Sequence, residues 1–174
     1  MERKICILGG TFDPVHLGHL NLATELFEKN GLDEVWWVPA QANPFKNGTP
    51  PIAFEHRAAM VRLAIEGIPS FLLKETEKNH SAPTYMIDTL HSSIKESPSF
   101  YRFYLLLGED TALRFNEWKS SEELRSLAPI LIASRSMKIS STEVRQRLLE
   151  GRPCEHLLPA AVLRYIQAHK LYCI

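Results

Sequence analysis

The chain has 174 residues, with 20 lysines and arginines against 20 aspartates and glutamates, so its formal net charge is zero. Zero net charge excludes an overall basic field of the kind that holds proteins on nucleic acid, and we expect no nucleic-acid partner. Apolar residues make up 45% and charged residues 23% of the chain, which argues against disorder and predicts one domain over residues 1–174. Any anion site must therefore be built from a few placed groups.

The cysteines and the N-terminal residues indicate where the protein works. Cys6, Cys154 and Cys173 are far apart, odd in number and form no CxxC pattern, which fits a reducing compartment. The first apolar run extends only from Ile5 to Leu8, too short for a signal-peptide core, and no apolar stretch approaches the roughly 20 residues of a membrane span. We therefore expect a soluble, cytoplasmic protein that makes no membrane contact.

Strand and helix patterns alternate from the N-terminus onward. The apolar run over residues 5–8 ends at Gly9-Gly10 and predicts a buried strand. Apolar residues at helical spacing follow from Leu17 until Gly31, and residues 34–39 form a second strand pattern. Strand, glycine turn, helix and strand in so short a span predict a βαβ unit with parallel pairing.

The rest of the chain continues this alternation. Residues 40–51 contain three prolines and a glycine and predict a loop. Ser120 with Glu123, and Ser140 with Glu143, have capping-box spacing. Further helices are predicted over 54–66, 85–96, 140–150 and 159–169, with another short helix opening at Ser120, and further strands over 71–73, 103–107 and 129–133. The sequence therefore predicts an α/β fold, a Rossmann-like, doubly wound parallel sheet with helices on both faces, which binds ligands at the carboxyl ends of its strands.

The segment GGTFDPVHLGH, residues 9–19, lies where that rule places a ligand. Its glycines let backbone N–H groups approach an anion, and the following helix N-terminus adds free N–H donors and a partial positive charge. His16 and His19 are three residues apart, so both rings can project to the same side of the helix start, with Gly18 leaving room for phosphates. Two imidazoles can stabilise the charge that develops on phosphoryl oxygens.

Other interpretations of this segment remain. The histidines could be structural, or His-x-x-His could be half of a metal site, although no nearby cysteine or third histidine supports a metal. The glycines match neither the dinucleotide GxGxxG spacing nor the GxxxxGKS phosphate loop.

A second polar cluster, ISSTEVR, occupies residues 139–145. Ser140 and Glu143 by themselves predict only a helix cap. Three consecutive hydroxyls and Arg145 exceed what a cap requires, and hydroxyls, free N–H groups and a guanidinium on one helical turn can cradle a polyphosphate.

These two motifs resemble the signatures of the (H/T)xGH nucleotidyltransferase superfamily, and GGTFDPVHLGHL resembles the opening of bacterial nicotinate-mononucleotide adenylyltransferases in particular. The resemblance implies that His16 and His19 bind ATP phosphates and that Thr11 and Phe12 lie at the nucleotide site. It also implies that the Ser, Thr and Arg of ISSTxxR contact the outer phosphates.

Stretches between the motifs extend the resemblance. Lys46, in NPFK, would contact a phosphate, although Phe45 replaces the family's histidine. TYMIDTL resembles a segment near the pyridine ring, with Met86 in place of a threonine. GED resembles the family's GxD, in which Asp110 would accept hydrogen bonds from ligand hydroxyls; its alternative role is to cap a helix. Trp118 matches the tryptophan that stacks on the pyridine.

One departure from the family lies between Arg135 and Ile139. Arg135 resembles a family arginine, but family members insert a longer segment before ISST, and only residues 136–138 remain here. The shortening bears on adenine recognition and subunit contacts more than on the chemistry.

The resemblance implies an enzyme of NAD biosynthesis that transfers AMP from ATP to nicotinate mononucleotide, with Mg²⁺ bound through ATP and with ATP and a pyridine mononucleotide as partners. The alternatives are a pantetheine-phosphate adenylyltransferase, an enzyme that prefers nicotinamide mononucleotide, and a catalytically weak nucleotide-binding protein. A homo-oligomer is left open. The expected catalytic residues are His16, His19 and Arg145. The expected mononucleotide site consists of Thr11, Lys46, Thr84, Tyr85 and Trp118. The expected ATP site consists of Gly9, Gly10, Thr11, Phe12, His16, Gly18, His19, Gly108, Asp110, Arg135, Ser140, Ser141, Thr142 and Arg145.

Overall fold

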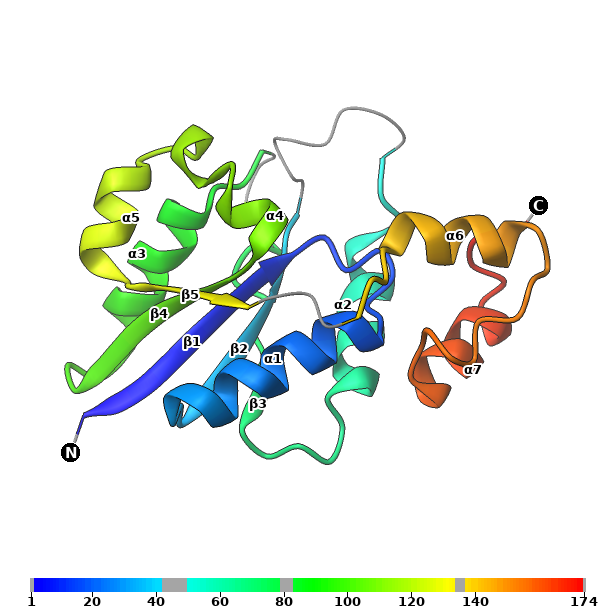
Figure 1. The fold of residues 1–174 in the computed structure, drawn as a ribbon, viewed down its shortest axis with the longest axis horizontal. Coiled ribbons are helices and arrows are strands. Elements are labelled where there is room, and N and C mark those ends of the chain that lie inside the picture. Colours follow the sequence, from blue (N-terminus) through cyan, green and yellow to red (C-terminus); the bar gives the residue numbers. More distant parts are fainter. Residues whose placement is uncertain (1, 42–49, 79–82, 134–136, 174) are drawn as a thin grey trace.

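The computed structural model describes residues 2–41, 50–78, 83–133 and 137–173 (Figure 1). Five strands form one parallel sheet in the order β3-β2-β1-β4-β5. The strands are β1 (Arg3–Gly10), β2 (Glu34–Pro39), β3 (Phe71–Leu73), β4 (Tyr101–Gly108) and β5 (Ile130–Ala133). The predicted doubly wound α/β fold is confirmed.

Helices follow the strands in the predicted alternation. They are α1 (Leu17–Asn30), α2 (Phe54–Ala64), α3 (Met86–Glu96), α4 (Glu109–Ala112), the 3-10 turn η1 (Phe115–Glu117), α5 (Ser121–Leu127), α6 (Ser141–Leu149) and α7 (Ala160–Ala168). Gly31 ends α1 in the left-handed conformation, with φ 57°, as its place after the last apolar residue predicted. The short pieces α4 and η1 were not predicted, because they are shorter than the helical repeat that sequence periodicity can detect.

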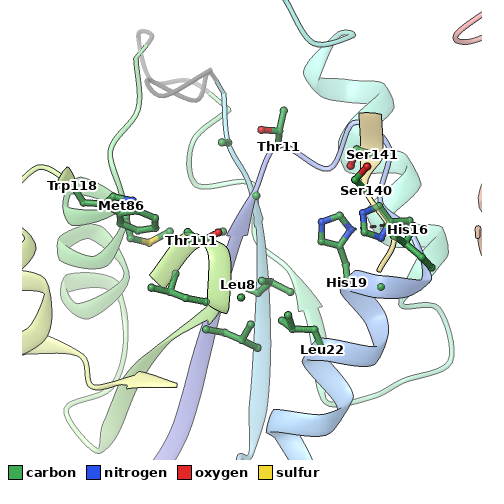
Figure 2. Close-up of a pocket in the computed structure, with 18 of the residues that line it drawn as sticks. Leu8, Thr11, His16, His19, Leu22, Met86, Thr111, Trp118, Ser140 and Ser141 are labelled. Carbon is green, nitrogen blue, oxygen red and sulfur yellow. Dashed lines mark hydrogen bonds between the residues drawn. The ribbon is translucent and has the colours of Figure 1, made fainter. Parts of the chain in front are cut away.

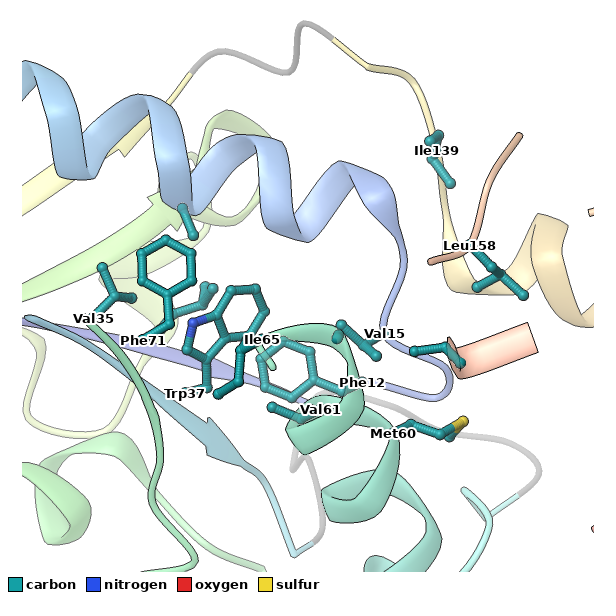
Figure 3. Close-up of a cluster of buried hydrophobic side chains, with 14 of the residues drawn as sticks. Phe12, Val15, Val35, Trp37, Met60, Val61, Ile65, Phe71, Ile139 and Leu158 are labelled. Carbon is teal, nitrogen blue, oxygen red and sulfur yellow. The ribbon is translucent and has the colours of Figure 1, made fainter. Parts of the chain in front are cut away.

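Side chains alternate across the sheet and build a core on each face. Cys6 and Leu8 of β1 belong to the core on one face, with residues of α1, α2 and β2. Figure 3 shows part of this core, with Trp37 of β2 beside Phe71 and Phe12. Ile5 and Ile7 point to the other face and pack with α3 and α5. Helices therefore cover both faces, and α6 and α7 lie beyond the carboxyl end of β1 (Figure 1).

The two expected capping boxes have different outcomes. Ser140 caps α6, because its hydroxyl accepts a hydrogen bond from the backbone N–H of Glu143 at 3.1 Å. Ser120 precedes α5 with φ 55°, and within the described residues its hydroxyl makes no capping hydrogen bond. The short helix predicted to open at Ser120 is confirmed as α5 (Ser121–Leu127), but the capping box predicted for it is wrong, because the backbone at Ser120 is left-handed and its hydroxyl does not meet the helix N–H groups.

In the part of the chain that the structure describes, no helix is both long enough and apolar enough to cross a membrane. Cys6 and Cys154 are buried and Cys173 is exposed, and all three thiols are free. Burial raises the pKa of the Cys6 thiol far above its usual range, so this thiol stays protonated and unreactive in the folded protein.

Candidate active site

The main cavity lies where the strand order reverses. The chain places β2 and β3 on one side of β1 and then returns to place β4 on the other, so the reversal falls between β1 and β4. A cavity of about 370 Å³ opens at this point, lined by Gly9 and Gly10 at the end of β1 and by Leu107 and Gly108 at the end of β4 (Figure 2). The volume is sufficient for a nucleotide-sized ligand.

One end of the cavity carries the two histidines at the start of α1. The His16 and His19 rings stack with their centroids 3.7 Å apart, and the backbone N–H of His16 donates to His19 Nδ1 at 3.2 Å. Because Nδ1 of His19 accepts this hydrogen bond, the neutral ring carries its own proton on Nε2. The local fold therefore sets the tautomer that can donate a hydrogen bond to a phosphoryl oxygen.

A hydroxyl group near the end of β1 also suits a ligand. Thr11 lines the cavity, and its Oγ1 is buried without a hydrogen-bond partner among the residues that the structure describes. A buried hydroxyl without a partner lowers stability, so a bound ligand or water that completes its hydrogen bond would be favoured.

Gly18, between the histidines, lies close to the His16 ring on one side and to Ile139 on the other. A Cβ at this position would lie 3.0 Å from Nδ1 and 3.1 Å from Cε1 of His16, and 3.4 Å from Cβ of Ile139. The space beside Gly18 therefore accommodates the His16 ring, where we had expected it to accommodate phosphates.

We expect Gly18→Ala to lower kcat/KM by about tenfold, because the His16 ring must shift by a few tenths of an ångström. The fold should remain, since alanine is up to about 1 kcal/mol better than glycine in a helix. Pyrophosphate release and thermal unfolding of the variant check this, and an unchanged kcat/KM would contradict it.

The first turn of α6 lies beside the histidine pair, at the same end of the cavity (Figure 2). Ser140, Ser141 and Thr142 line the cavity (Figure 2). The Ser141 hydroxyl donates to the carbonyl oxygen of Pro14 at 2.9 Å, which ties this helix to the loop after β1. Three hydroxyls and the helix N-terminus thus lie at the same end of the cavity as the two histidines, an arrangement suited to an anion.

Asp13 joins three distant parts of the chain beside α6. The Arg145 guanidinium donates to the backbone carbonyl of Asp13 at 2.7 Å and lies 3.8 Å from its carboxylate, and the Tyr172 hydroxyl donates to Asp13 Oδ1 at 2.7 Å. Arg145 is thus placed against the loop after β1. Burial and the neighbouring Asp13 carboxylate raise the pKa of Tyr172.

We expect Tyr172→Phe to lower the free energy of unfolding by about 1.5 kcal/mol, since it removes a hydrogen bond to a carboxylate. A raised pKa means that the Tyr172 contribution is complete below the unfolded tyrosine pKa of about 10 and is lost as the pH rises above it. The difference between wild type and variant should therefore shrink above pH 10. Urea unfolding from pH 8 to 11 measures it, and a difference that does not change with pH would contradict the contact.

The other end of the cavity is lined by aromatic side chains. Trp118, after η1, and Met86 lie on the side of β1 away from the histidines (Figure 2). Tyr85, which directly precedes Met86 at the start of α3, also lines the cavity. Flat aromatic rings can stack on a planar heterocycle.

Glu77 holds the wall beside this aromatic end. Its side chain is buried, with 4% exposed, and its carboxylate accepts hydrogen bonds from the hydroxyls of Thr84 and Thr89, the latter at 2.7 Å, and from the backbone N–H of Gln41 at 3.1 Å. Glu77 therefore joins the segments after β2 and β3 to α3.

Arg57, on α2, is the most deeply buried charged side chain near the site, with 1% exposed. Its guanidinium donates to the carbonyl oxygens of Thr11 at 2.8 Å, Ala40 at 2.7 Å, Ile52 at 3.0 Å and Gln41 at 3.3 Å. Burial lowers the pKa of Arg57 while the nearby Asp13 charge raises it. This side chain fixes the backbone after β1 against the backbone after β2.

The structure brings most of the expected site residues to one cavity. Three of them do not line it. Phe12 lies in the core, 1% exposed, with its ring edge-on to the His19 ring at 5.1 Å between centroids. Asp110 lies on the exposed first turn of α4, and Arg145 lies against Asp13. Lys46 and Arg135 lie outside the described residues. The expected residues that line the cavity are Gly9, Gly10, Thr11, His16, Gly18, His19, Thr84, Tyr85, Gly108, Trp118, Ser140, Ser141 and Thr142.

Sequence reasoning missed Arg57, Glu77 and Tyr172. A signal existed for Arg57, because it occupies the same helical stripe as the buried Met60 and Ala64. Nothing local marked Glu77 or Tyr172, whose partners lie in other segments of the chain. Among the described residues, no three His, Cys, Asp or Glu side chains are grouped so that they could hold a metal ion.

Comparison with known proteins identifies the class. The model of the cytidylyltransferase-like family matches residues 7–147, and the chain belongs to that family. Within it, the chain belongs to the nicotinate-nucleotide adenylyltransferases. It is 35% identical to a protein of Oceanobacillus iheyensis, with 98% of this chain and 97% of the relative covered. It is 36% identical to a protein of Dehalococcoides mccartyi, with the same coverage of each chain. Both carry the name "Probable nicotinate-nucleotide adenylyltransferase".

A solved structure shares the fold. Plasmodium falciparum nicotinic acid mononucleotide adenylyltransferase, complexed with NaAD, superimposes with a TM-score of 0.78 at 24% identity, covering 98% of this chain and 97% of that one.

Proposed function

We propose that this enzyme transfers the adenylyl group of ATP to nicotinate mononucleotide, giving nicotinate adenine dinucleotide and pyrophosphate. The observation that carries the proposal is one cavity with two different ends. His16, His19 and the hydroxyls of α6 lie at one end, and Tyr85 and Trp118 lie at the other. The names of the relatives at 35–36% identity supply the substrate.

In the proposed reaction, a phosphate oxygen of the mononucleotide attacks the α-phosphorus of ATP. A bond from that oxygen to phosphorus forms, the bond from the α-phosphorus to the bridging oxygen breaks, and pyrophosphate leaves with the electron pair. The nucleophile is already an anion near neutral pH, so no general base is needed. Catalysis would then come from positioning and from hydrogen-bond donors that meet the developing charge.

The side chains at the histidine end would act mainly as donors to phosphate. His16, His19, Ser140 and Thr142 supply ring N–H and hydroxyl groups here, with no carboxylate beside them among the described lining residues. Such a donor set fits an Mg²⁺ ion that is bound through the phosphate oxygens of ATP. When bound, the ion would neutralise charge on the phosphates.

We also propose that residues 1–174 form a single domain, because two cores share one sheet. The partners would be ATP and a pyridine mononucleotide, and the enzyme would act in the cytoplasm, where buried free thiols such as Cys6 and Cys154 stay reduced. Whether it acts as a homo-oligomer is a question for sedimentation analysis.

The test is to incubate the protein with ATP and Mg²⁺ and one of three acceptors, and to follow pyrophosphate. Release with nicotinate mononucleotide supports the proposal. Release with phosphopantetheine alone would make the protein a pantetheine-phosphate adenylyltransferase. Nucleotide binding without release for any acceptor, including nicotinamide mononucleotide, would make it a nucleotide-binding protein.

A further inference from the structure

One cation stands apart from the phosphate end of the cavity. Among the lining residues that the structure describes, Lys119 is the only lysine or arginine, and it directly follows Trp118. Figure 2 places Trp118 on the opposite side of the cavity from His16 and Ser140. A cation at this aromatic end is too remote from the histidines to share their phosphate ligand.

The Lys119 ammonium group is held over the wall of the cavity. Its Nζ lies 4.5 Å from the centroid of the Tyr85 ring and 3.3 Å from Oδ2 of Asp88. The side chains of Lys119 and Asp88 are 50% and 47% exposed. An ion pair as exposed as this contributes little, so an incoming anion can replace Asp88 without a large loss.

Among the charged lining residues that the structure describes at this end of the cavity, Lys119 is the one that attracts an anion. Met86 has no hydrogen-bond donor in its side chain, and Glu77 is the one carboxylate among the described lining residues. Glu77 accepts hydrogen bonds from Thr84, Thr89 and the Gln41 N–H, and the ion pair of Lys119 is with Asp88 and not with Glu77.

The substrates of the proposed reaction contain one anionic group that is not a phosphate. It is the ring carboxylate of nicotinate mononucleotide, which is replaced by a neutral amide in nicotinamide mononucleotide. Adenine is uncharged at neutral pH. A lysine beside the aromatic end would therefore act on the pyridine carboxylate and would favour the acid over the amide.

We propose that Lys119 is a specificity-determining residue, which binds the ring carboxylate of nicotinate mononucleotide while the ring lies against Trp118 and Tyr85. The inference rests on the proposed function. The ammonium group would exchange its contact with Asp88 for the substrate carboxylate and would keep its place over Tyr85.

The test is the ratio of kcat/KM for nicotinate mononucleotide to kcat/KM for nicotinamide mononucleotide. Lys119→Met should lower this ratio by about tenfold, through a higher KM for the acid alone, which is the effect of losing one charge-assisted hydrogen bond. Lys119→Arg should retain the ratio. Lys95→Met, which removes an exposed lysine from the last turn of α3, is the matched control and should change nothing.

Two results would overturn the inference: an unchanged ratio in Lys119→Met, or an equal loss with both mononucleotides, which would show a structural role. Binding of each mononucleotide measured by calorimetry gives the same comparison without turnover. If the wild-type enzyme releases no pyrophosphate with nicotinate mononucleotide, the proposed function fails, and the calorimetric ratio still decides the role of Lys119.

Discussion

Replacing His19 with alanine should lower kcat by about a hundredfold or more, the loss that follows removal of one transition-state donor. The His19 ring is fixed on three sides, by stacking on His16, by the edge of Phe12 and by the backbone N–H that its Nδ1 accepts. A ring held in this way loses little freedom when the transition state forms, so its hydrogen bond is fully available to the reaction.

The expected loss falls on kcat more than on KM, because the interaction strengthens as charge develops on the phosphoryl oxygens. Pyrophosphate release at saturating substrate measures it. His91→Ala is the matched control, because His91 is an exposed histidine that pairs with Glu123 at 2.9 Å, away from the cavity, and its removal should leave kcat unchanged. Near wild-type turnover by His19→Ala would show that His19 has no catalytic role.

The second large effect is expected at Arg57. Arg57→Met keeps an unbranched, apolar stem but removes the guanidinium, which leaves the carbonyl oxygens of Thr11, Ala40 and Ile52 without this donor. We expect the free energy of unfolding to fall by about 3 kcal/mol, and the melting temperature by about 6–12 °C for a chain of this length. Because Thr11 and Ala40 both line the cavity, kcat/KM should fall by about tenfold or more.

Arg62→Met is the control for Arg57. Arg62 lies on the same helix, its side chain is 63% exposed, and its ion pair with Glu75 has a separation of 3.6 Å, so the change should alter stability by less than about 1 kcal/mol. Urea unfolding of both variants makes the comparison. Equal stabilities for the two variants would mean that the Arg57 hydrogen bonds do not fix these segments.

The sequence predicted the sheet and most of the helices because their signals are local. An apolar run that ends at Gly9-Gly10, and a helical stripe that ends at Gly31, can each be recognised within about 15 residues. The alternation of such segments leaves few ways to order a parallel sheet with right-handed crossovers. Both motifs also lie at helix starts, which any doubly wound fold directs toward the same edge of the sheet.

Phe12 shows where local reasoning ended. Its place at the nucleotide site, which the family resemblance implies, stays a prediction, and what the sequence did not show is that the backbone at φ 50° turns its ring into the core beside Trp37, at 5.5 Å between centroids. The ring there supports His19. Asp110 likewise occupies an exposed first turn of a helix too short for periodicity to predict.

By itself, the sequence determined the α/β class, the two phosphate-type motifs and the aromatic residue at position 118, because each depends on neighbours in the chain. Only the tertiary structure decided that Arg57 holds Thr11 across 46 positions, that Tyr172 meets Asp13 across 159, and that Lys119 lies over Tyr85. These contacts satisfy buried or charged groups whose partners are chosen by the packing of the whole fold, and no local pattern records that choice.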